Sequence, residues 1–333
     1  MEEWRLLFRD NSIVKRLLKV GGKQMGEAQV NALNLAEMER IAKGIRMRVL
    51  AHTLSNNGGY MSQACSAAEL LAAMYGGILK LGALDGPINP PPFLGVPMVG
   101  TPSVENYTTG AQFHGPKSAD NDRFIISPAH YALVVYAALI ETNRLREDGL
   151  DFFNKDGSTV EMIGAEHSPG FETTTGSLSQ AISQAGGIAI ARKIRGESGK
   201  TWVFMSDGEF QEGQTWEALQ ASAFHKLSKL RVIVDVNAGQ CDGPMESVMS
   251  IEPLADKVKA FGWDVSVVDG HDLSELTAAC LKESEKPHMV LCYTDPVRGL
   301  PLLDERRPSL HYLRFKSEEE HSKYERAYEE MVK

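Results

Sequence analysis

The chain has 333 residues, of which 43% are hydrophobic, and its formal net charge is −9 at pH 7. The apolar fraction supplies a large core and excludes wholesale disorder, while the acidic balance argues against the basic face that nucleic acids require. No apolar run approaches the roughly 20 residues that span a bilayer, residues 1–18 lack the apolar core of a signal peptide, and the four cysteines form no CxxC pair. We therefore expect a soluble, cytoplasmic protein that binds neither membranes nor nucleic acid.

The first third of the chain predicts helices followed by an unusual loop. Residues 1–33 are charged and irregular, which favours a short helical extension, and residues 35–54 repeat apolar side chains at helical spacing. Ser66 and Glu69 have the spacing of a capping box, which predicts that a second helix begins at Ser66. Residues 83–120 are rich in proline and glycine, but their aromatic residues favour an ordered flap over a linker.

Beyond this flap, short apolar strands alternate with helices. The predicted strands cover 123–127, 202–205, 230–236, 264–268 and 289–293, and the predicted helices cover 130–144, 178–195, 215–225, 251–261 and 274–283. This alternation predicts an α/β fold, in which a mainly parallel sheet carries helices on both faces. We expect one domain over residues 34–315, with 83–120 as an insertion, followed by a charged, solvated helix over 316–333.

Oxygen-bearing groups follow two of the predicted strands. Asp207 and Gly208 come directly after one strand, and Asn237 and Gly239 come after the next. Asp207 and Asn237 are 30 positions apart, which leaves room for one helical crossover that would bring both to the same sheet edge. A carboxylate, an amide oxygen and the Gly239 carbonyl are hard ligands, which suit Mg²⁺ or Ca²⁺ and leave positions for diphosphate oxygens.

A third polar feature precedes the predicted helix over 178–195. Gly176, Ser177 and Leu178 lie where that helix should start, and the backbone amides of a helix start favour an anion. An isolated Asp-Gly pair is usually an ordinary turn. The spacing and the strand context together favour a ligand site instead.

Three segments resemble those of transketolases. Residues 206–243 read SDGEFQEGQTWEALQASAFHKLSKLRVIVDVNAGQCDG, which resembles the family's thiamine diphosphate motif of Gly-Asp-Gly followed about thirty residues later by Asn. Residues 122–141 and 169–191 resemble two further segments, and the similarity covers about 40–315. It is strongest with the separate N-terminal subunit of split transketolases, because the chain stops where the pyrimidine-binding domain would begin. The resemblance implies the thiamine diphosphate-binding fold.

The resemblance also implies roles for the residues of these segments. Asp207, Asn237 and the Gly239 carbonyl would hold the metal ion. The residues that would line the diphosphate and thiazolium of the cofactor, together with Asn237, are Gly176, Ser177, Leu178 and Gly208.

Three further residues match family positions. His130 and His311 fall where the family has histidines beside the cofactor. The alternative for His130 is a surface histidine at a helix start. Glu212 matches a glutamate that links the two active sites across the dimer interface. An acid near a helix start is also favoured by the helix dipole.

Two departures from the family pattern concern the substrate. Tyr60 and Ile163 stand where the family usually has histidines that contact the sugar. A further, mild departure lies in the cofactor motif, where Ser206 replaces the first glycine. Unpaired buried hydroxyls would cost about 1–3 kcal/mol each. We therefore expect a rebuilt substrate pocket and a donor other than an ordinary sugar phosphate, as in specialised metabolism.

The resemblance implies cofactor-borne carbanion chemistry that transfers a two-carbon ketol or acyl unit. The activating glutamate belongs to the other domain, so a C-terminal transketolase-like subunit with the pyrimidine-binding domain is expected as partner, in an α₂β₂ assembly. One alternative is the α-subunit of a 2-oxoacid dehydrogenase-type decarboxylase, which usually lacks the Thr-Thr-Gly-Ser-Leu segment at 174–178. Another is a non-catalytic relative, which would have little reason to keep the metal-binding residues.

Overall fold

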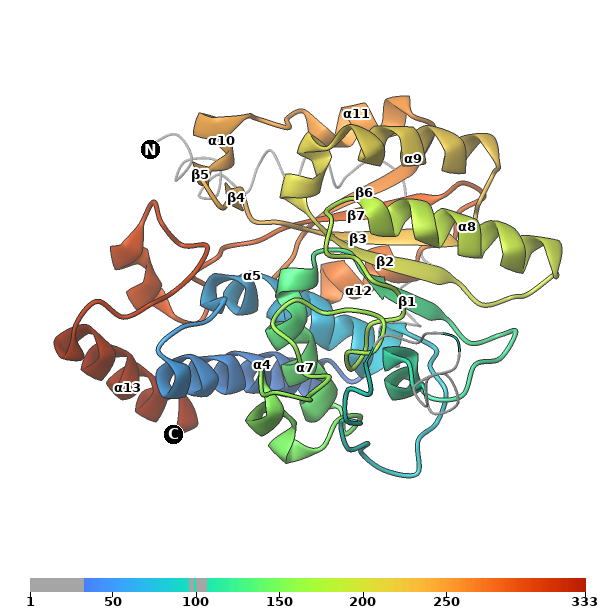
Figure 1. The fold of residues 1–333 in the computed structure, drawn as a ribbon. Helices are drawn as coiled ribbons and strands as arrows, with labels where there is room; N and C mark the ends of the chain where they lie inside the picture. The colour runs from blue at the N-terminus through green and yellow to red at the C-terminus, as the bar shows by residue number, and fades with distance from the viewer. Residues whose placement is uncertain (1–32, 96–98, 100–106) are drawn as a thin grey trace.

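A central five-stranded sheet organises the molecule, as the computed structural model shows for residues 33–95, 99 and 107–333 (Figure 1). The strands are β1 (Arg123–Ile126), β2 (Thr201–Ser206), β3 (Leu230–Val236), β6 (Asp264–Asp269) and β7 (His288–Tyr293). Their order is β1-β2-β3-β7-β6, and every neighbouring pair is parallel. The expected parallel α/β sheet is therefore confirmed.

Helices cover both faces of this sheet (Figure 1). The α-helices are α4 (Leu35–Asn56), α5 (Met61–Ala73), α7 (Ala132–Glu141), α8 (Gln180–Ile194), α9 (Gly213–Phe224), α10 (Met245–Val248), α11 (Leu254–Ala260), α12 (Leu273–Leu281) and α13 (Glu318–Val332). The shorter helical turns are η1 (Met74–Ile78), η2 (Gly110–His114), η3 (Ala129–Tyr131), η4 (Glu147–Phe152), η5 (Asp207–Gln211) and η6 (Pro301–Arg306). A hairpin of β4 (Gly239–Gln240) and β5 (Gly243–Pro244) follows β3.

The core is divided by the sheet into two apolar clusters. Successive side chains of a strand point to opposite faces, so Ile233 packs into the cluster with α4, α5, α7 and α12, whereas Val232 and Val234 pack into the cluster with α8, α9 and α11. All seven residues of β3 are buried. Burial on both faces explains why this strand is apolar except for Arg231 and Asp235.

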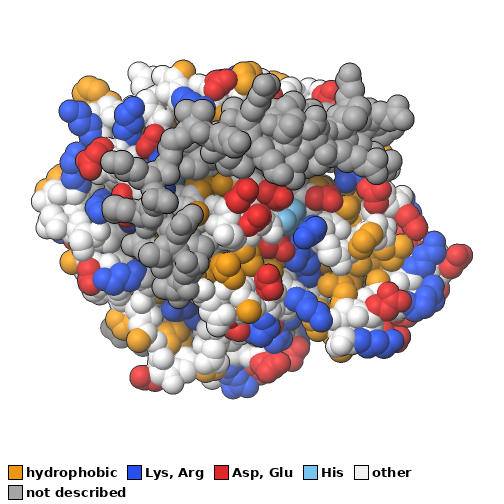
Figure 2. Space-filling model, turned by 180° about the vertical axis from the view of Figure 1, so that it is seen from behind, with side chains coloured by type: hydrophobic (Ala, Val, Ile, Leu, Met, Phe, Trp, Pro, Cys, Tyr) orange, Lys and Arg blue, Asp and Glu red, His pale blue; other side chains and the backbone are white. Residues whose placement is uncertain are grey.

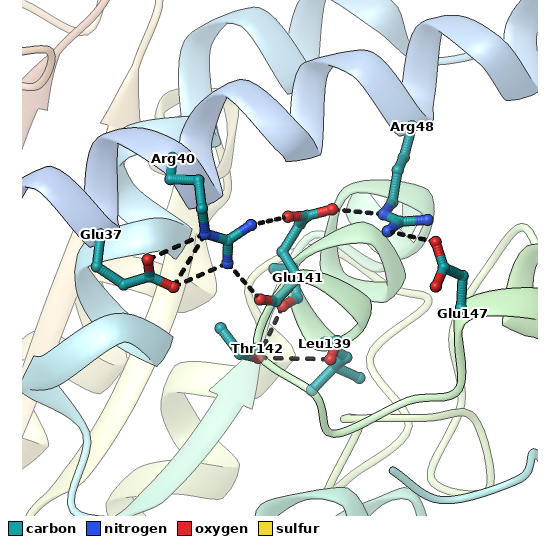
Figure 3. A network of polar contacts seen from close by, with 8 residues as sticks. Glu37, Arg40, Arg48, Leu139, Glu141, Thr142 and Glu147 are labelled. Atoms are coloured by element: carbon teal, nitrogen blue, oxygen red, sulfur yellow. Dashed lines mark hydrogen bonds and ion pairs between the residues drawn. The ribbon is translucent and has the colours of Figure 1, made fainter.

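Helices α4 and α7 are joined by a shared carboxylate (Figure 3). Arg40 Nη1 lies 2.6 Å from Glu141 Oε2, and Arg48 Nε donates to Glu141 Oε1 at 2.5 Å. Gly44 lies on α4 between the two arginines, and a Cβ there would come within 2.2 Å of the Glu141 carboxyl carbon. Glycine at this position therefore allows the close approach of the two helices.

The second helix begins earlier than the capping-box pattern predicts, so that prediction is wrong. Helix α5 begins at Met61, and Ser66 lies inside it. The Ser66 hydroxyl donates to Asp235 Oδ2 at 2.6 Å, while Glu69 forms an ion pair with Arg46. Both polar residues are thus satisfied by distant partners rather than by a helix start.

The C-terminal helix and part of the flap pack against the body of the molecule. Helix α13 buries Tyr324 against α4, so the expected solvated helix has one packed side. In the flap, Pro92 forms a backbone bridge with Ser158, and η2 packs into the body through His114. Residues 96–98 and 100–106 of the flap lie outside the described residues, as do residues 1–32 of the predicted extension.

The distribution of charge on the surface and the length of the helices can be compared with what nucleic acids and membranes require. On the face seen in Figure 2, acidic and basic side chains are interspersed, and the described residues there form no continuous basic area. Within the described ranges, no helix is long and apolar enough to cross a membrane.

Candidate functional site

The carboxyl ends of β2 and β3 bring the predicted polar residues together. Ser206 and Asp235 are register partners at the ends of these strands. Asp207 begins the turn η5, and its Oδ2 accepts a hydrogen bond from the Ala238 amide at 2.7 Å. The Asp207 side chain therefore lies against the segment that carries Asn237, as the 30-residue spacing requires.

The second oxygen of Asp207 has no partner. Asp207 is 1% exposed, and its Oδ1 is buried without a hydrogen bond to any described residue. Burial raises the pKa of this carboxyl well above its ordinary value, and the nearby Asp235 carboxylate adds to the rise. A positive charge beside Oδ1 would relieve both penalties.

Asn237 is oriented by a buried acid that the sequence analysis did not single out. Its Nδ2 donates to Asp235 Oδ2 at 3.1 Å and to the Tyr131 hydroxyl at 3.3 Å, while its Oδ1 accepts from the Gly239 amide at 3.0 Å. Ala238 takes a left-handed conformation with φ of 56°, which turns the chain sharply after Asn237. An acid inside an apolar strand was the available sequence signal for Asp235.

Glu209 is a second residue that the sequence analysis passed over. It is fully buried and accepts hydrogen bonds from the Ser179 and Ser206 amides, both at 2.8 Å, and from the Ser127 hydroxyl. These bonds join the loop before α8 to the ends of β1 and β2. Ser179 has φ of 67°, and α8 begins only at Gln180.

The late start of α8 corrects one expectation. Gly176, Ser177 and Leu178 lie in the loop before the helix rather than in its first turn, so they are not the helix start that the sequence predicts. Gly176 and Leu178 nevertheless line the cleft above the sheet, whereas Ser177 is exposed and does not.

An open cleft with a volume of about 2890 Å³ lies over this sheet edge. The predicted site residues that line it are His130, Ile163, Gly176, Leu178, Asp207, Gly208, Glu212, Asn237, Gly239 and His311. No atom lies within 4 Å of the position that a Cβ at Gly208 would take, so the chain there leaves open space. Most of the residues predicted from three separate segments therefore face one cavity.

An aromatic group borders this cleft. The rings of His130 and His311 have centroids 5.2 Å apart, and the Tyr60 ring lies 5.5 Å from the first and 5.6 Å from the second. Burial, together with the charge of His311, lowers the pKa of His130 to about 4, and burial also lowers the pKa of His311. Both imidazoles are therefore neutral at pH 7. Tyr60 packs against both rings but does not itself line the cleft, unlike Ile163, which is 44% exposed.

Glu212 lies at the edge of the cleft, between η5 and α9. Its side chain is exposed, and none of the described residues forms a hydrogen bond or ion pair with it. This position is compatible with an interface role and with a simple helix-start acid.

The carboxyl ends of the parallel strands open into a cleft that is lined by acid, amide and imidazole groups. This arrangement defines a ligand-binding α/β protein. The family described as transketolase, thiamine diphosphate binding domain, matches residues 95–311, and the chain belongs to this family. The expected thiamine diphosphate-binding fold is thereby confirmed.

Relatives of known name support this membership. A transketolase family protein of Sinorhizobium fredii is 34% identical over 291 residues, which are 86% of this chain and 93% of that protein. One subunit of the apulose-4-phosphate transketolase of Phocaeicola vulgatus is 32% identical over 192 residues, 57% of this chain and 68% of that protein. The solved transketolase of Campylobacter jejuni has the same fold, with a TM-score of 0.64 at 20% identity, over 90% of this chain and 48% of the solved one. The chain is thus of the transketolase-like transferase type and spans about half of that solved chain.

Proposed function

We propose that this chain holds thiamine diphosphate through a divalent metal ion at the carboxyl edge of its sheet, and that it is the cofactor-binding subunit of a two-chain transketolase-like transferase. The observation that carries the proposal is Asp207, which lines the cleft and whose buried Oδ1 has no partner among the described residues. A buried, unpaired carboxylate oxygen is costly unless a cation or a donor meets it.

The residues present fit a metal–diphosphate group better than a metal held by protein alone. In the described part of the chain, no group of three or more His, Cys, Asp or Glu side chains could hold a metal ion. Asp207, the Asn237 amide oxygen and the Gly239 carbonyl would supply three oxygens, and diphosphate oxygens would complete the shell of Mg²⁺ or Ca²⁺. Asp235 engages the Asn237 amide nitrogen, which fixes the orientation of the amide oxygen.

Other residues of the cleft would position the cofactor. Gly208 leaves the space that a diphosphate needs, and Gly176 and Leu178 line the same cleft, with Ser177 between them in the chain. His130 and His311, both neutral at pH 7, would offer ring nitrogens without repelling a cationic thiazolium. When bound, thiamine diphosphate supplies stabilised carbanion chemistry for making and breaking C–C bonds; the chain binds and orients it.

The reaction would be transfer of a two-carbon ketol or acyl unit, and it would need a second chain. One relative is named as a subunit of a transketolase, which supports this division. The partner would carry the pyrimidine-binding domain and the activating glutamate, in an α₂β₂ assembly. Glu212, exposed at the cleft edge, would then contact the other chains.

The substrate pocket supports a donor other than a common ketose phosphate. Ile163 offers an apolar side chain to the cleft, and Tyr60 fills the space against the histidine rings. Two relatives are named as subunits of an apulose-4-phosphate transketolase and of a 6-deoxy-6-sulfo-D-fructose transketolase, so each name carries a particular sugar. They support a specialised substrate for this chain.

The metal assignment is tested by Asp207→Ala. This change removes the metal-bridging carboxylate, so calorimetric titration with thiamine diphosphate at saturating Mg²⁺ should detect no binding, while circular dichroism remains that of the parent. Asp256→Ala, which removes an exposed carboxylate on α11, should bind as the parent does. Unchanged affinity in Asp207→Ala would reject the assignment.

The two-chain reaction is tested by reconstitution. Donor-dependent turnover should require both this chain and the pyrimidine-binding partner, with thiamine diphosphate and Mg²⁺ present. If the pair uses standard ketose phosphates with the efficiency of ordinary transketolases, the idea of a rebuilt substrate pocket is wrong.

A further inference from the structure

The segment that carries His311 is tied to the start of α5. Gly59 and Leu313 exchange two backbone hydrogen bonds, at 3.0 and 2.9 Å, in an isolated antiparallel bridge. Within α5, the side-chain nitrogen of Gln63 donates to the His311 carbonyl at 3.1 Å. Gln63 is 3% exposed, and both Gln63 and His311 line the cleft. The position of the His311 imidazole therefore depends on helix α5.

Hydrogen bonds determine which way the Gln63 amide faces. A carbonyl oxygen can only accept, so the amide atom that lies against the His311 carbonyl must be the nitrogen. The amide oxygen accepts from the Ser62 hydroxyl at 2.9 Å, which agrees with this orientation. The same amide nitrogen lies 3.3 Å from Nδ1 of the His311 ring. Nδ1 is therefore the acceptor in this contact.

The proton of the His311 ring follows from this contact. Burial lowers the pKa of His311, so the ring is neutral at pH 7, with one nitrogen that donates and one that accepts. Because Nδ1 accepts from Gln63, Nε2 carries the proton. Nε2 has no hydrogen-bond partner within the described ranges, and it is not among their buried unpaired atoms. A ligand in the cleft can therefore reach a free N–H group of this ring.

We propose that Gln63 is a positioning residue of the cofactor site, which holds the His311 ring so that Nε2 donates a hydrogen bond to an anionic oxygen of the bound cofactor. The inference rests on the proposed function and adds to it the residue that decides which ring nitrogen meets the ligand. The diphosphate is the part of thiamine diphosphate that offers such oxygens, since the thiazolium is a cation. A hydrogen bond to an anionic oxygen is among the stronger kinds.

The tautomer can be measured in the full chain without ligand, by NMR after labelling of histidine with ¹⁵N. At pH 7, the signals that disappear in His311→Ala should show a proton on Nε2 and none on Nδ1. In Gln63→Glu, the new carboxylate can only accept, so Nδ1 should become protonated. A purely structural role of Gln63 would not move a proton onto this nitrogen. A proton on Nδ1 in the parent, or the same ring protonation in both proteins, would overturn the proposal.

A double-mutant cycle tests whether Gln63 acts through His311. Calorimetry with thiamine diphosphate at saturating Mg²⁺ compares the parent, Gln63→Met, His311→Ala and the double variant. One hydrogen bond to a charged group contributes roughly tenfold in affinity, so His311→Ala should lose about tenfold and Gln63→Met, which only releases the ring, about threefold. The double variant should lose no more than His311→Ala alone, because Gln63 has no effect once its partner is gone.

Gln214→Met is the matched control for this cycle. Gln214 lies on α9 outside the cleft wall, and its side-chain nitrogen also donates one hydrogen bond, to the Ser183 hydroxyl at 3.2 Å. This variant should bind thiamine diphosphate as the parent does.

The outcomes separate this inference from the proposed function. If the parent binds thiamine diphosphate but the two single losses add in the double variant, Gln63 does not act through His311, and the inference fails while the function stands. Unchanged cofactor affinity in His311→Ala has the same meaning, even if KM for the donor rises in the reconstituted enzyme. If the parent binds no thiamine diphosphate, the proposed function fails and the inference with it.

Discussion

The single residue Asp235 organises the hydrogen bonds around the site. It is fully buried and accepts hydrogen bonds from four side chains: Ser66 at 2.6 Å, Thr294 at 2.6 Å, Tyr131 at 2.9 Å and Asn237 at 3.1 Å. These donors come from α5, η3 and the ends of β3 and β7. The carboxylate therefore joins the helical layer to the sheet edge and orients the proposed metal ligand Asn237 at the same time.

Asp235→Ala should damage both stability and binding. The change leaves several buried donors unpaired, and because each costs about 1–3 kcal/mol, we expect the free energy of unfolding to fall by about 3 kcal/mol or more. Affinity for thiamine diphosphate and Mg²⁺ should fall as well, because Asn237 loses its orienting partner. Denaturant unfolding and calorimetry measure the two effects. Asp242→Ala, an exposed carboxylate on the neighbouring hairpin, is the control; equal stability of the two variants would contradict the role of Asp235.

Among the secondary-structure elements, the turn η2 is held against the sheet by a buried acid. His114 of η2 lies 3.0 Å from Glu172 Oε1 through Nδ1 and 3.0 Å from the Tyr75 hydroxyl through Nε2. Glu172 also accepts from the Phe124 amide at 2.9 Å and pairs with Arg123. Burial alone would raise the pKa of Glu172, but the hydrogen bond with His114 and the charges of His114 and Arg123 outweigh it and lower the pKa to about 2.

Glu172→Gln should therefore change how stability depends on pH. A carboxyl whose pKa falls from 4.5 in the unfolded chain to about 2 in the folded one contributes stability that is present above pH 4.5 and is lost as the pH falls towards 2. At pH 7 the variant should be less stable by about 3 kcal/mol, and the difference from the parent should shrink below pH 4.5. Denaturant unfolding across this range measures it, with the exposed Glu217→Gln as control. A difference that is constant with pH would contradict the assignment.

Local patterns predicted most elements because apolar periodicity determines them. The prediction for β3 coincides with Leu230–Val236, since a strand buried on both faces is a continuous apolar run. The starts of α5 and α8 were missed for a different reason. Ser66 bonds a residue 169 positions away, and Ser179 is held by Glu209, 30 positions away. Such partners cannot be inferred from neighbouring residues, so the spacing located Asp207 and Asn237 but not the buried acids that support them.

Over the molecule as a whole, exposed apolar side chains lie on segments that border the open cleft, among or between residues that line it. Leu178, Val248 and Met249 are 37%, 44% and 52% exposed, on the loop before α8 and at the end of α10. Exposed apolar residues beside an open ligand cleft are typical of interaction sites. The proposed partner subunit would cover this edge, where the proposed cofactor and Glu212 also lie.

Val248→Asp should therefore weaken assembly with the pyrimidine-binding partner. An unpaired charge in the centre of an interface is costly, so we expect at least about a tenfold loss of affinity, or about 1.4 kcal/mol. The fold and the unfolding free energy should stay unchanged, because Val248 is already exposed in the single chain. Ile194→Asp is the matched control, since Ile194 is 81% exposed at the far end of α8, about 21 Å along the helix from its start beside the cleft. Titration of each variant with the partner, followed by size-exclusion chromatography, measures the effect. Equal affinities for the two variants would show that the partner docks elsewhere, and the exposed apolar edge of the cleft would then have no part in assembly.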